Sequence, residues 1–373
     1  SSIDYVGGIT ATINRSNISG ACVLGDISVR GGNGVLYLGG IAGTYTNSHN
    51  FASNYSGFTT QNSSCYSKIS ITGDSPYSQI YVGGIYGLTT EQITMQNGLA
   101  EPQGESKNIY YALYSSADIN VDTQASYIYA GGVIGKAQQG IMQVDSEDET
   151  QFTYTPFTKP NVMLRVASCG FIGDLIVNND QMTDGTTYLG GIVGESELLV
   201  QDAYSNGAIS YQTQGQAPVY LGGIVGLANN HIFGAVSLSV INISREYDED
   251  TNSFVDPITT VAESLSSQDK KTQIRVDNVY CSPELNGVYP SVGSAMTALE
   301  AFSTVTGDLI KANLNNWFYH EVEYGEGEDA ITLAVIIPAA LSGMVDYTIG
   351  GEIAPALISD YSQIIDFMAD NTY

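Results

Sequence analysis

The chain contains little positive charge. Of its 373 residues, 12 are Lys or Arg and 39 are Asp or Glu, which gives a formal net charge of −27 at pH 7. Nucleic acids and anionic membrane surfaces both call for a basic patch, so this composition disfavours them as partners. The balance favours a soluble, self-repelling extracellular protein that attracts cations.

Long hydrophobic runs are also missing. No stretch approaches the ~20 apolar residues that cross a bilayer, and the longest run, Ile331–Leu341, is interrupted by Thr332 and Pro338. That run is typical of a buried strand, and we expect no membrane insertion within this chain. The N-terminus shows no signal-peptide pattern and begins almost inside a repeat, so we expect that an upstream segment has been removed.

Known catalytic motifs are absent as well. A G-x-S-x-G elbow does not occur, and the histidines fit neither H-E-x-x-H nor a two-His-one-carboxylate site. Three aspartates recur at one turn position, where they form either a glycosidase-type carboxylate row or, as we favour, hydrogen bonds to their own backbone. The histidines are His49, His231 and His320, and the aspartates are Asp26, Asp118 and Asp174.

Acidic loops are the remaining place for a metal ion. Asp248-x-Asp250-x-Asn252 matches the opening of an EF-hand loop, but Ser253 and Thr259 stand where that loop requires Gly and Glu. A solvated acidic loop is the default interpretation, and a looser calcium site stays open. Its candidate ligands are Asp248, Asp250 and Asp256, or the run from Asp145 to Glu149.

One pattern dominates what is present. An aromatic residue, an aliphatic residue, Gly-Gly and then Ile or Val recur six times, a repeat of the size found in solenoids. Glycine turns corners that strain other residues, and without a Cβ it lets the next coil stack closely. The pairs are Gly7 and Gly8, Gly39 and Gly40, Gly83 and Gly84, Gly131 and Gly132, Gly190 and Gly191, and Gly222 and Gly223.

Equal positions in successive coils of a solenoid should stack as ladders. The residue after each Gly pair predicts a buried aliphatic ladder, and the aromatic residue before it predicts a neighbouring aromatic one. The aliphatic residues are Ile9, Ile41, Ile85, Val133, Ile192 and Ile224. The aromatic residues are Tyr37, Tyr81, Tyr129, Tyr188 and Tyr220.

A second element lies between the Gly-Gly motifs. It consists of a small residue, a turn and alternating aliphatic residues, and this period-two alternation is a strand signal. Examples are Gly25–Val29, Ser67–Ile71, Ala117–Val121, Gly173–Val177 and Gly207–Ser210. The sequence therefore predicts an all-β solenoid with at least two strands in each unit.

The cysteines stand at related places in these units. Three of them precede the alternating aliphatic segment of their unit by four to six residues. The fourth stands in a degenerate copy of the repeat unit, and Ala203 occupies the cysteine position in another unit. A position that accepts Cys or Ala predicts a small buried core site with free thiols, and a disulfide between neighbouring coils is the alternative. The residues are Cys22, Cys65, Cys169 and Cys281.

We expect a solenoid over residues 1–290. Where two successive Gly-Gly pairs are unusually far apart in sequence, the extra residues predict an insertion. These insertions lie at about 90–106, 138–161 and 245–277, and such loops often form the working face of a repeat protein. Beyond them, Ser294–Asn315 predicts a broken helix, while Trp317–Tyr324 and Ile331–Ile337 predict strands. Because an uncovered solenoid end aggregates, we interpret residues 291–373 as a C-terminal cap or closing domain.

These repeats resemble the GLUG-motif family over roughly residues 5–242. The family pattern is a buried Cys, a Gly-Asp turn with a strand, and Tyr-aliphatic-Gly-Gly-aliphatic-aliphatic-Gly, which stands here as Cys169–Val177 followed by Tyr188–Gly194. The resemblance implies a right-handed parallel β-helix (β-solenoid) with irregular loop insertions, here with a small mixed C-terminal cap, in a secreted or cell-surface protein. Repeats of this family are common in adhesins and in spacer modules beside enzymes.

The leading hypothesis is a non-enzymatic β-solenoid that mediates adhesion or binds a host or environmental glycan or protein. The alternatives are a subunit that polymerises head-to-tail into a filament or sheath, and a polysaccharide-degrading enzyme on a β-helix scaffold. Apart from calcium, no cofactor is expected. Tyrosine suits sugar and protein recognition, and the candidate exposed ligand-binding residues are Tyr45, Tyr55, Tyr66, Tyr154 and Tyr247.

Overall fold

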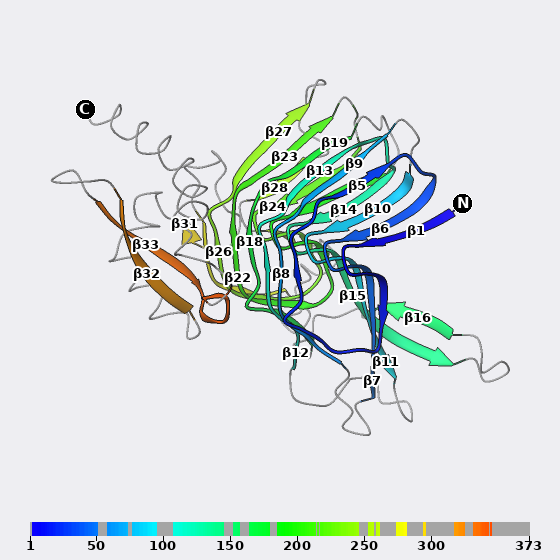
Figure 1. The fold of residues 1–373 in the computed structure, drawn as a ribbon, viewed down its shortest axis with the longest axis horizontal. Coiled ribbons are helices and arrows are strands. Elements are labelled where there is room, and N and C mark those ends of the chain that lie inside the picture. The colour runs from blue at the N-terminus through cyan, green and yellow to red at the C-terminus, as the bar shows by residue number, and fades with distance from the viewer. Residues whose placement is uncertain are drawn as a thin grey trace.

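The computed structural model shows stacked parallel strands (Figure 1). It describes residues 2–50, 58–73, 77–94, 107–144, 152–156, 164–179, 185–213, 215, 217–245, 253–256, 259–261, 274–281, 294–295, 317–324, 331–342 and 344. Within these ranges the chain is all-β and contains no α-helix. No helix of this part is long and apolar enough to span a membrane.

Four parallel sheets form the body of the molecule, and the chain visits them in a fixed order, here called sheets I to IV. Sheet I contains β1 (Ser2–Gly7), β6 (Gly34–Gly39), β10 (Tyr77–Gly83), β14 (Tyr127–Gly131), β20 (Thr186–Gly190), β24 (Val219–Gly222) and β28 (Ser253–Asp256). Sheet II contains β2 (Thr10–Asn14), β7 (Ala42–Asn50), β11 (Tyr86–Thr94), β15 (Ile134–Val144), β21 (Val193–Ser196), β25 (Val225–Ala228) and β29 (Thr259–Val261), with β16 (Phe152–Pro156) antiparallel to β15.

Sheets III and IV complete each coil. Sheet III contains β3 (Ile18–Ser19), β4 (Cys22–Val23), β8 (Thr60–Cys65), β12 (Lys107–Ser115), β17 (Leu164–Ala167), β18 (Gly170–Ile172), β22 (Leu199–Asn206), β26 (Ile232–Ser237), β30 (Val276–Cys281) and β31 (Ser294–Ala295). Sheet IV contains β5 (Ile27–Arg30), β9 (Lys68–Thr72), β13 (Asp118–Thr123), β19 (Leu175–Asn179), β23 (Ala208–Thr213) and β27 (Val240–Arg245). Each strand thus pairs with the equivalent strand of the next repeat, the arrangement of a β-helix or solenoid.

The paired glycines form the corner between sheets I and II. Gly7, Gly39 and Gly83 pair in register as the last residues of their sheet I strands. A Cβ on Gly39 would lie 2.1 Å from the carbonyl oxygen of Ala42, and one on Gly40 would lie 2.1 Å from that of Gly84. These contacts are with backbone atoms, so a larger residue would force the coils apart.

The aliphatic residue after the glycine pair turns into the core. Ile41, Ile85, Val133 and Ile192 are fully buried. Ile9 differs from the prediction because 54% of its surface is exposed. It lies in the first described coil, which is stacked against a neighbouring coil on one side only.

Sheet III contains a row of left-handed residues that the sequence analysis did not predict. One residue in each coil has a φ between 51° and 69°, and the strand register places these residues opposite one another. A left-handed residue bends a strand without ending its pairing on either side. The row consists of Gly20, Asn62, Ala112, Ser168, Asp202, Gly234 and Asn278.

The stack also extends further than the glycine pattern indicated. The interval 245–277, predicted as an insertion, contains β28 and β29, where Phe254 and Asp256 pair in register with Tyr220 and Gly222. The pattern was missed because Phe replaces Tyr and Asp replaces Gly. In the interval 138–161, β15 and β16 form an antiparallel hairpin, and β11 extends to Thr94 inside the first predicted insertion.

The described C-terminal residues lie beside the stack. As predicted, β32 (Trp317–Tyr324) and β33 (Ile331–Pro338) are strands, which pair as an antiparallel hairpin followed by the 3₁₀ turn Ala339–Leu341. This hairpin contacts the outer side of sheet III through Trp317 and the following Leu341. Most of residues 291–373, predicted as a C-terminal cap or closing domain, lie outside the described residues, so that prediction stays open. Of the predicted helix 294–315, only residues 294 and 295 are described, and they form β31 instead.

Candidate binding surface

Seven aromatic side chains form a continuous ladder on the outer side of sheet I. Their neighbours along the strands, such as Leu36 and Leu38, are fully buried, so strand alternation directs the aromatic residues outward. Ring centroids of successive residues are 4.6–5.3 Å apart, and their planes differ by at most 24°. We call this the tyrosine ladder; it contains Tyr5, Tyr37, Tyr81, Tyr129, Tyr188, Tyr220 and Phe254.

The stacking of the rings determines which of their atoms are accessible to a ligand. Each inner ring covers the face of the next, so only ring edges and hydroxyl groups point to solvent. The end members are more open, with 42% of Tyr5 and 40% of Phe254 exposed. The surface is therefore a row of evenly spaced phenol hydroxyls beside an apolar ridge, which suits partners that present hydroxyl groups.

An ion pair in sheet II borders this ladder. Lys136 Nζ lies 2.8 Å from Glu195 Oε2 on the neighbouring coil, and it also lies 4.8 Å from the ring centroid of Tyr129. Asn229 Nδ2 donates to Glu195 Oε1 at 3.0 Å. Burial is the largest single influence and lowers the pKa of Lys136, but the charge and hydrogen bond of Glu195 together with the charge of Glu197 outweigh it, so the net shift is upward and the ammonium is retained.

The hydroxyls of Tyr81, Tyr129 and Tyr188 remain protonated far above neutral pH. Burial raises the pKa of Tyr188 to about 12, and the charge of Glu195 adds to this shift. Burial likewise raises the pKa of Tyr81 and Tyr129. These phenols can therefore donate as well as accept hydrogen bonds at any physiological pH.

The tyrosines predicted as binding residues lie elsewhere. Tyr45 is fully buried, which corrects the prediction, because an inward position of β7 places its ring beside those of Tyr86 and Tyr110. Tyr66 is 37% exposed, and its hydroxyl donates to the carbonyl of Met344 at 2.8 Å. Tyr154 lies in β16, where its side chain is not described, and Tyr55 and Tyr247 lie outside the described residues.

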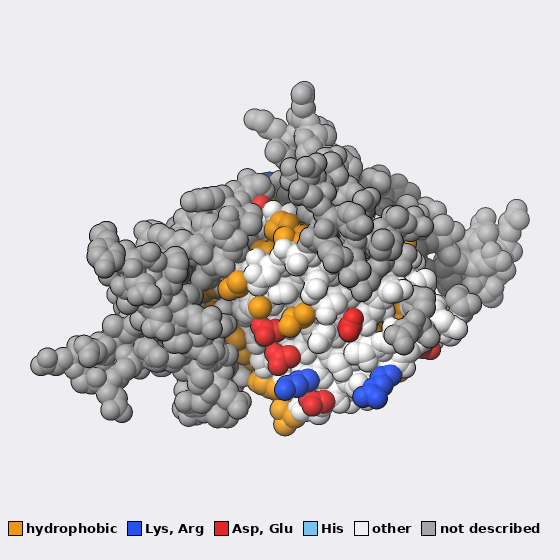
Figure 2. All heavy atoms as spheres, turned by 90° about the horizontal axis from the view of Figure 1, so that it is seen from above, with side chains coloured by type: hydrophobic (Ala, Val, Ile, Leu, Met, Phe, Trp, Pro, Cys, Tyr) orange, Lys and Arg blue, Asp and Glu red, His pale blue; other side chains and the backbone are white. Residues whose placement is uncertain are grey.

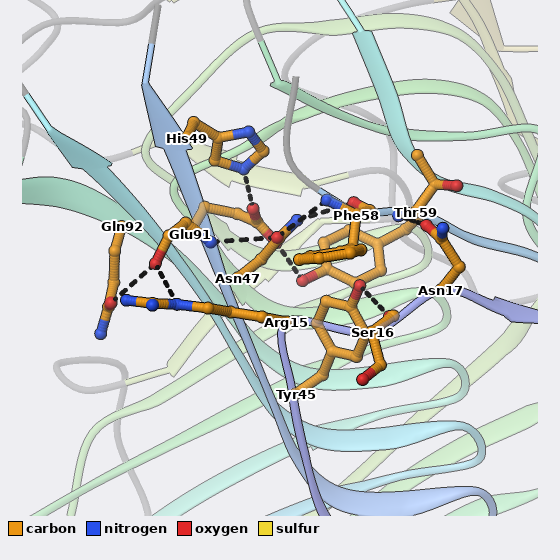
Figure 3. Close-up of polar contacts among 12 residues, drawn as sticks. Arg15, Ser16, Asn17, Tyr45, Asn47, His49, Phe58, Thr59, Glu91 and Gln92 are labelled. Carbon is orange, nitrogen blue, oxygen red and sulfur yellow. Dashed lines mark hydrogen bonds and ion pairs between the residues drawn. The ribbon is translucent and has the colours of Figure 1, made fainter. Parts of the chain in front are cut away.

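Tyr45 belongs to a buried polar cluster at the end of sheet II (Figure 3). Its hydroxyl donates to the carbonyl of Ser16 at 2.9 Å. Asn47 closes the loop that follows β7, because its amide nitrogen donates to the Phe58 carbonyl at 2.7 Å and its amide oxygen accepts from the Phe58 N–H at 3.0 Å. These bonds satisfy backbone groups at the point where the chain turns towards sheet III.

Glu91 lies at the centre of the same cluster. One carboxylate oxygen contacts His49 Nε2, the other accepts from the Tyr110 hydroxyl, and both Glu91 and His49 are fully buried. Burial, followed by the charge of Glu91, raises the pKa of Tyr110 well above its usual value. His, Glu and Tyr are the residues of acid–base catalysis, but here the protein encloses them, so the arrangement is one of internal support.

Asp256, one of the candidate calcium ligands, has a structural role instead. This residue is 2% exposed, stands at the first-glycine position of its coil, and accepts from the Thr259 N–H at 3.0 Å. It therefore supports the corner, which differs from the solvated acidic loop that we predicted. Asp248, Asp250 and the run 145–149 lie outside the described residues, and within those residues no group of three or more His, Cys, Asp or Glu could hold a metal ion.

The recurrent turn aspartates connect neighbouring coils. Asp26 accepts from the Lys68 N–H at 3.0 Å, and Asp174 accepts from the Ala208 N–H at 3.0 Å, while Asp118 makes a longer contact of 3.4 Å with the Asp174 N–H. Each carboxylate thus bonds the next coil, which differs from the predicted bond to its own backbone. Figure 2 shows the molecule from above, where the Asp, Glu, Lys and Arg side chains of the visible described surface are scattered among uncharged ones.

The cysteines do not form one ladder. All four are free, three are buried, and Cys22 is exposed, which corrects the prediction for that residue. Cys65 pairs opposite Val23 and Ser115, whereas Cys281 pairs opposite Ser237 and Ala295. They stand at different offsets from the left-handed row, since Cys169 directly follows Ser168 whereas Cys65 and Cys281 stand three residues after Asn62 and Asn278.

Comparison of the chain with protein-family models, with curated proteins and with solved structures found no match in any of the three.

Proposed function

We propose that this chain is a non-enzymatic binding protein that holds an extended glycan along its tyrosine ladder. The observation that carries the proposal is the outward row of seven stacked aromatic residues, which runs across every strand of sheet I. Exposed, continuous aromatic surfaces mark interaction sites, and phenol hydroxyls match the hydroxyl groups of a sugar chain. The net charge of −27 disfavours a polyanionic ligand.

The finer features of the fold belong to the same proposal. Parallel crossovers between neighbouring strands are right-handed in almost all proteins, which supports a right-handed β-helix. The repeat pattern from Tyr188 to Gly194 supports membership of the GLUG-motif family, and with it a secreted or cell-surface location for an adhesin-like protein. Calcium, through acidic loops, remains part of the hypothesis.

The test is a glycan array probed with the purified chain, with calcium and with EDTA. Tyr129→Phe together with Tyr188→Phe keeps the stacking and removes two hydroxyls, so we expect binding to fall about tenfold. Tyr211→Phe is the matched control, because it removes a hydroxyl that is buried inside the core. Retained affinity in the double variant, or no binding to any glycan, would refute this function.

An enzyme remains the weaker alternative. The strongest acid–base group in the described residues is His49–Glu91–Tyr110, and both His49 and Glu91 have no exposed surface that a polysaccharide could reach. Release of reducing ends or unsaturated products from a polysaccharide panel would overturn the non-enzymatic proposal.

Head-to-tail assembly is a second candidate, favoured by one observation. The first described coil exposes Ile3 by 54%, Ile9 by 54% and Leu24 by 73%. A further coil, supplied by a second copy or by a longer form of the chain, would cover these side chains. The mass in dilute solution distinguishes the cases, because a stable monomer excludes obligate assembly of copies.

A further inference from the structure

A small cavity lies between the outer side of sheet III and the C-terminal hairpin. Its volume is about 210 Å³, and its sheet wall includes Tyr111, Arg165, Gln201 and Asp202. On the other side it is lined by Ala339 and Ala340, the first residues of the 3₁₀ turn. It lies apart from the tyrosine ladder, which is on sheet I.

Three contacts hold the hairpin over this cavity. Trp317 Nε1 donates to Asp202 Oδ1 at 3.0 Å, and Trp317 is 5% exposed. Leu341 packs over Gly170, where a Cβ would come within 2.6 Å of its side chain. The Tyr66 hydroxyl donates to the Met344 carbonyl at 2.8 Å. The space is therefore bordered by a specific packing arrangement between segments far apart in sequence.

The polar groups of the wall form one connected chain. Arg165 Nη1 donates to Gln201 Oε1 at 2.6 Å, and Gln201 Nε2 lies 3.4 Å from Asp202 Oδ2. Burial lowers the pKa of Arg165, while the charge of Asp202 opposes this shift. One positive and one negative charge leave the wall neutral overall.

The residue chemistry selects a class of ligand. A guanidinium has five N–H donors and a carboxylate has about four acceptor positions, so both can serve a ligand while they keep their present partners. A hydroxyl group donates and accepts at once, and neighbouring hydroxyls of a sugar would match Asp202 and Arg165 respectively. A free anion would meet the carboxylate, and an apolar ligand would leave these groups unsatisfied.

We propose that the cavity between sheet III and the turn Ala339–Leu341 binds a single neutral sugar unit, held by Arg165, Gln201 and Asp202. Its volume lies below the roughly 300–1,000 Å³ of sites for drug-sized molecules, so one monosaccharide is the largest ligand of this chemistry that we expect. The methyl groups of Ala339 and Ala340 leave the room that the ring would occupy. This site does not depend on the proposed function of the ladder.

The only tryptophan of the chain provides the readout, since Trp317 bonds directly to Asp202. Titration with glucose, galactose, mannose and N-acetylglucosamine should change Trp317 emission saturably in the millimolar range for at least one sugar. Arg165→Gln should weaken that binding about 10- to 100-fold. Arg275→Gln is the matched control, because this arginine lies outside the cavity beside Phe233 and Asp277.

A second variant fills the space. Ala340→Leu should abolish binding, and unchanged Trp317 emission in the absence of sugar shows that the hairpin is still in place. No saturable response to any of the four sugars would overturn the proposal, as would full binding in Arg165→Gln.

Glycerol and inorganic phosphate are the comparison probes, and tighter binding of phosphate than of every sugar would assign the cavity to an anion instead. The ladder variant Tyr129→Phe with Tyr188→Phe should leave this titration unchanged.

Discussion

Glu91 is a fully buried carboxylate that contacts two side chains from other strands, His49 and Tyr110. The strand register places Glu91 opposite Asn47 on one side and Gln139 on the other, so amide residues occupy the same position in neighbouring coils. A buried ionisable group is tolerated only when its partners remain present. This position therefore depends more on hydrogen-bonding partners than on hydrophobic packing.

We expect Glu91→Ala to destabilise the protein by about 3–5 kcal/mol, because it removes the acceptor that serves both His49 and Tyr110 inside the core. Glu91→Gln should cost less, about 1–2 kcal/mol, since the amide keeps the size of the side chain and matches Gln139 in the next coil. Urea unfolding of the two variants measures the difference. Equal destabilisation by both changes would contradict this account.

Tyr188 of the tyrosine ladder makes the stability of the protein sensitive to high pH. Because the pKa of Tyr188 is raised from its usual value of 10 to about 12, the folded state favours the protonated phenol. This contribution is fully present below pH 10 and is lost as pH rises from 10 through 12. We expect the unfolding temperature to fall over that interval, with phenolate absorbance appearing late. Tyr188→Phe should reduce this dependence of the unfolding temperature on pH. The same dependence in wild type and variant would contradict the role given to Tyr188.

The cysteines should differ in reactivity. Burial raises the pKa of both Cys169 and Cys281 to about 12, whereas Cys22 is exposed. Because the thiolate is the reactive form, a thiol reagent should modify one cysteine rapidly in the native protein and all four in denaturant. Cys22→Ser should remove the rapid phase, and rapid labelling that persists in this variant would place a second thiol at the surface.

At the scale of single elements, the left-handed row bends sheet III in seven successive coils. Asn278 and Asn62 occupy this position with φ near 50°, as Gly20 and Gly234 do with φ near 70°. Asparagine and glycine tolerate this conformation, whereas a β-branched residue does not. The bend interrupts the strict alternation of inward and outward side chains along the strand. It therefore determines which side chains after it point into the core.

Substitution at Gly234 tests this element. Gly234→Asn should change the stability by less than about 1 kcal/mol, because asparagine stands opposite it at position 278. Gly234→Val should cost about 2 kcal/mol or more, since its Cβ branches crowd the left-handed backbone. The unfolding temperatures of the two variants measure this difference. Equal effects of Asn and Val would show that the backbone at position 234 relaxes out of the left-handed conformation.

The strand pattern was the most predictable part of each element. Alternating aliphatic residues identified five segments of sheet IV, from β5 to β23, and the glycine pairs located the corners between sheets I and II. The coil with Phe254 and Asp256 was missed because these residues replace the Tyr and Gly of the motif. The left-handed row had no sequence signal, since it contains Gly, Asn, Ala, Ser and Asp.

At the scale of the whole molecule, the excess of 27 negative charges acts on the compact state through self-repulsion. Raising sodium chloride from about 0.1 M to about 1 M shortens the Debye length from about 10 Å to about 3 Å. We therefore expect the unfolding temperature to rise with salt. An unfolding temperature that falls over this range would show that specific ion pairs, such as Lys136–Glu195, outweigh the general repulsion.

The sequence by itself determined the repeat, the parallel stacking and the aromatic ladder, because glycine corners and strand alternation act between near neighbours in each coil. Only the tertiary structure decided that Tyr45 is buried, that Glu91 joins His49 to Tyr110, and that Trp317 reaches Asp202 across 115 residues of chain. The physical reason is that burial depends on what covers a surface, and the covering segment comes from a distant part of the chain that no local pattern identifies.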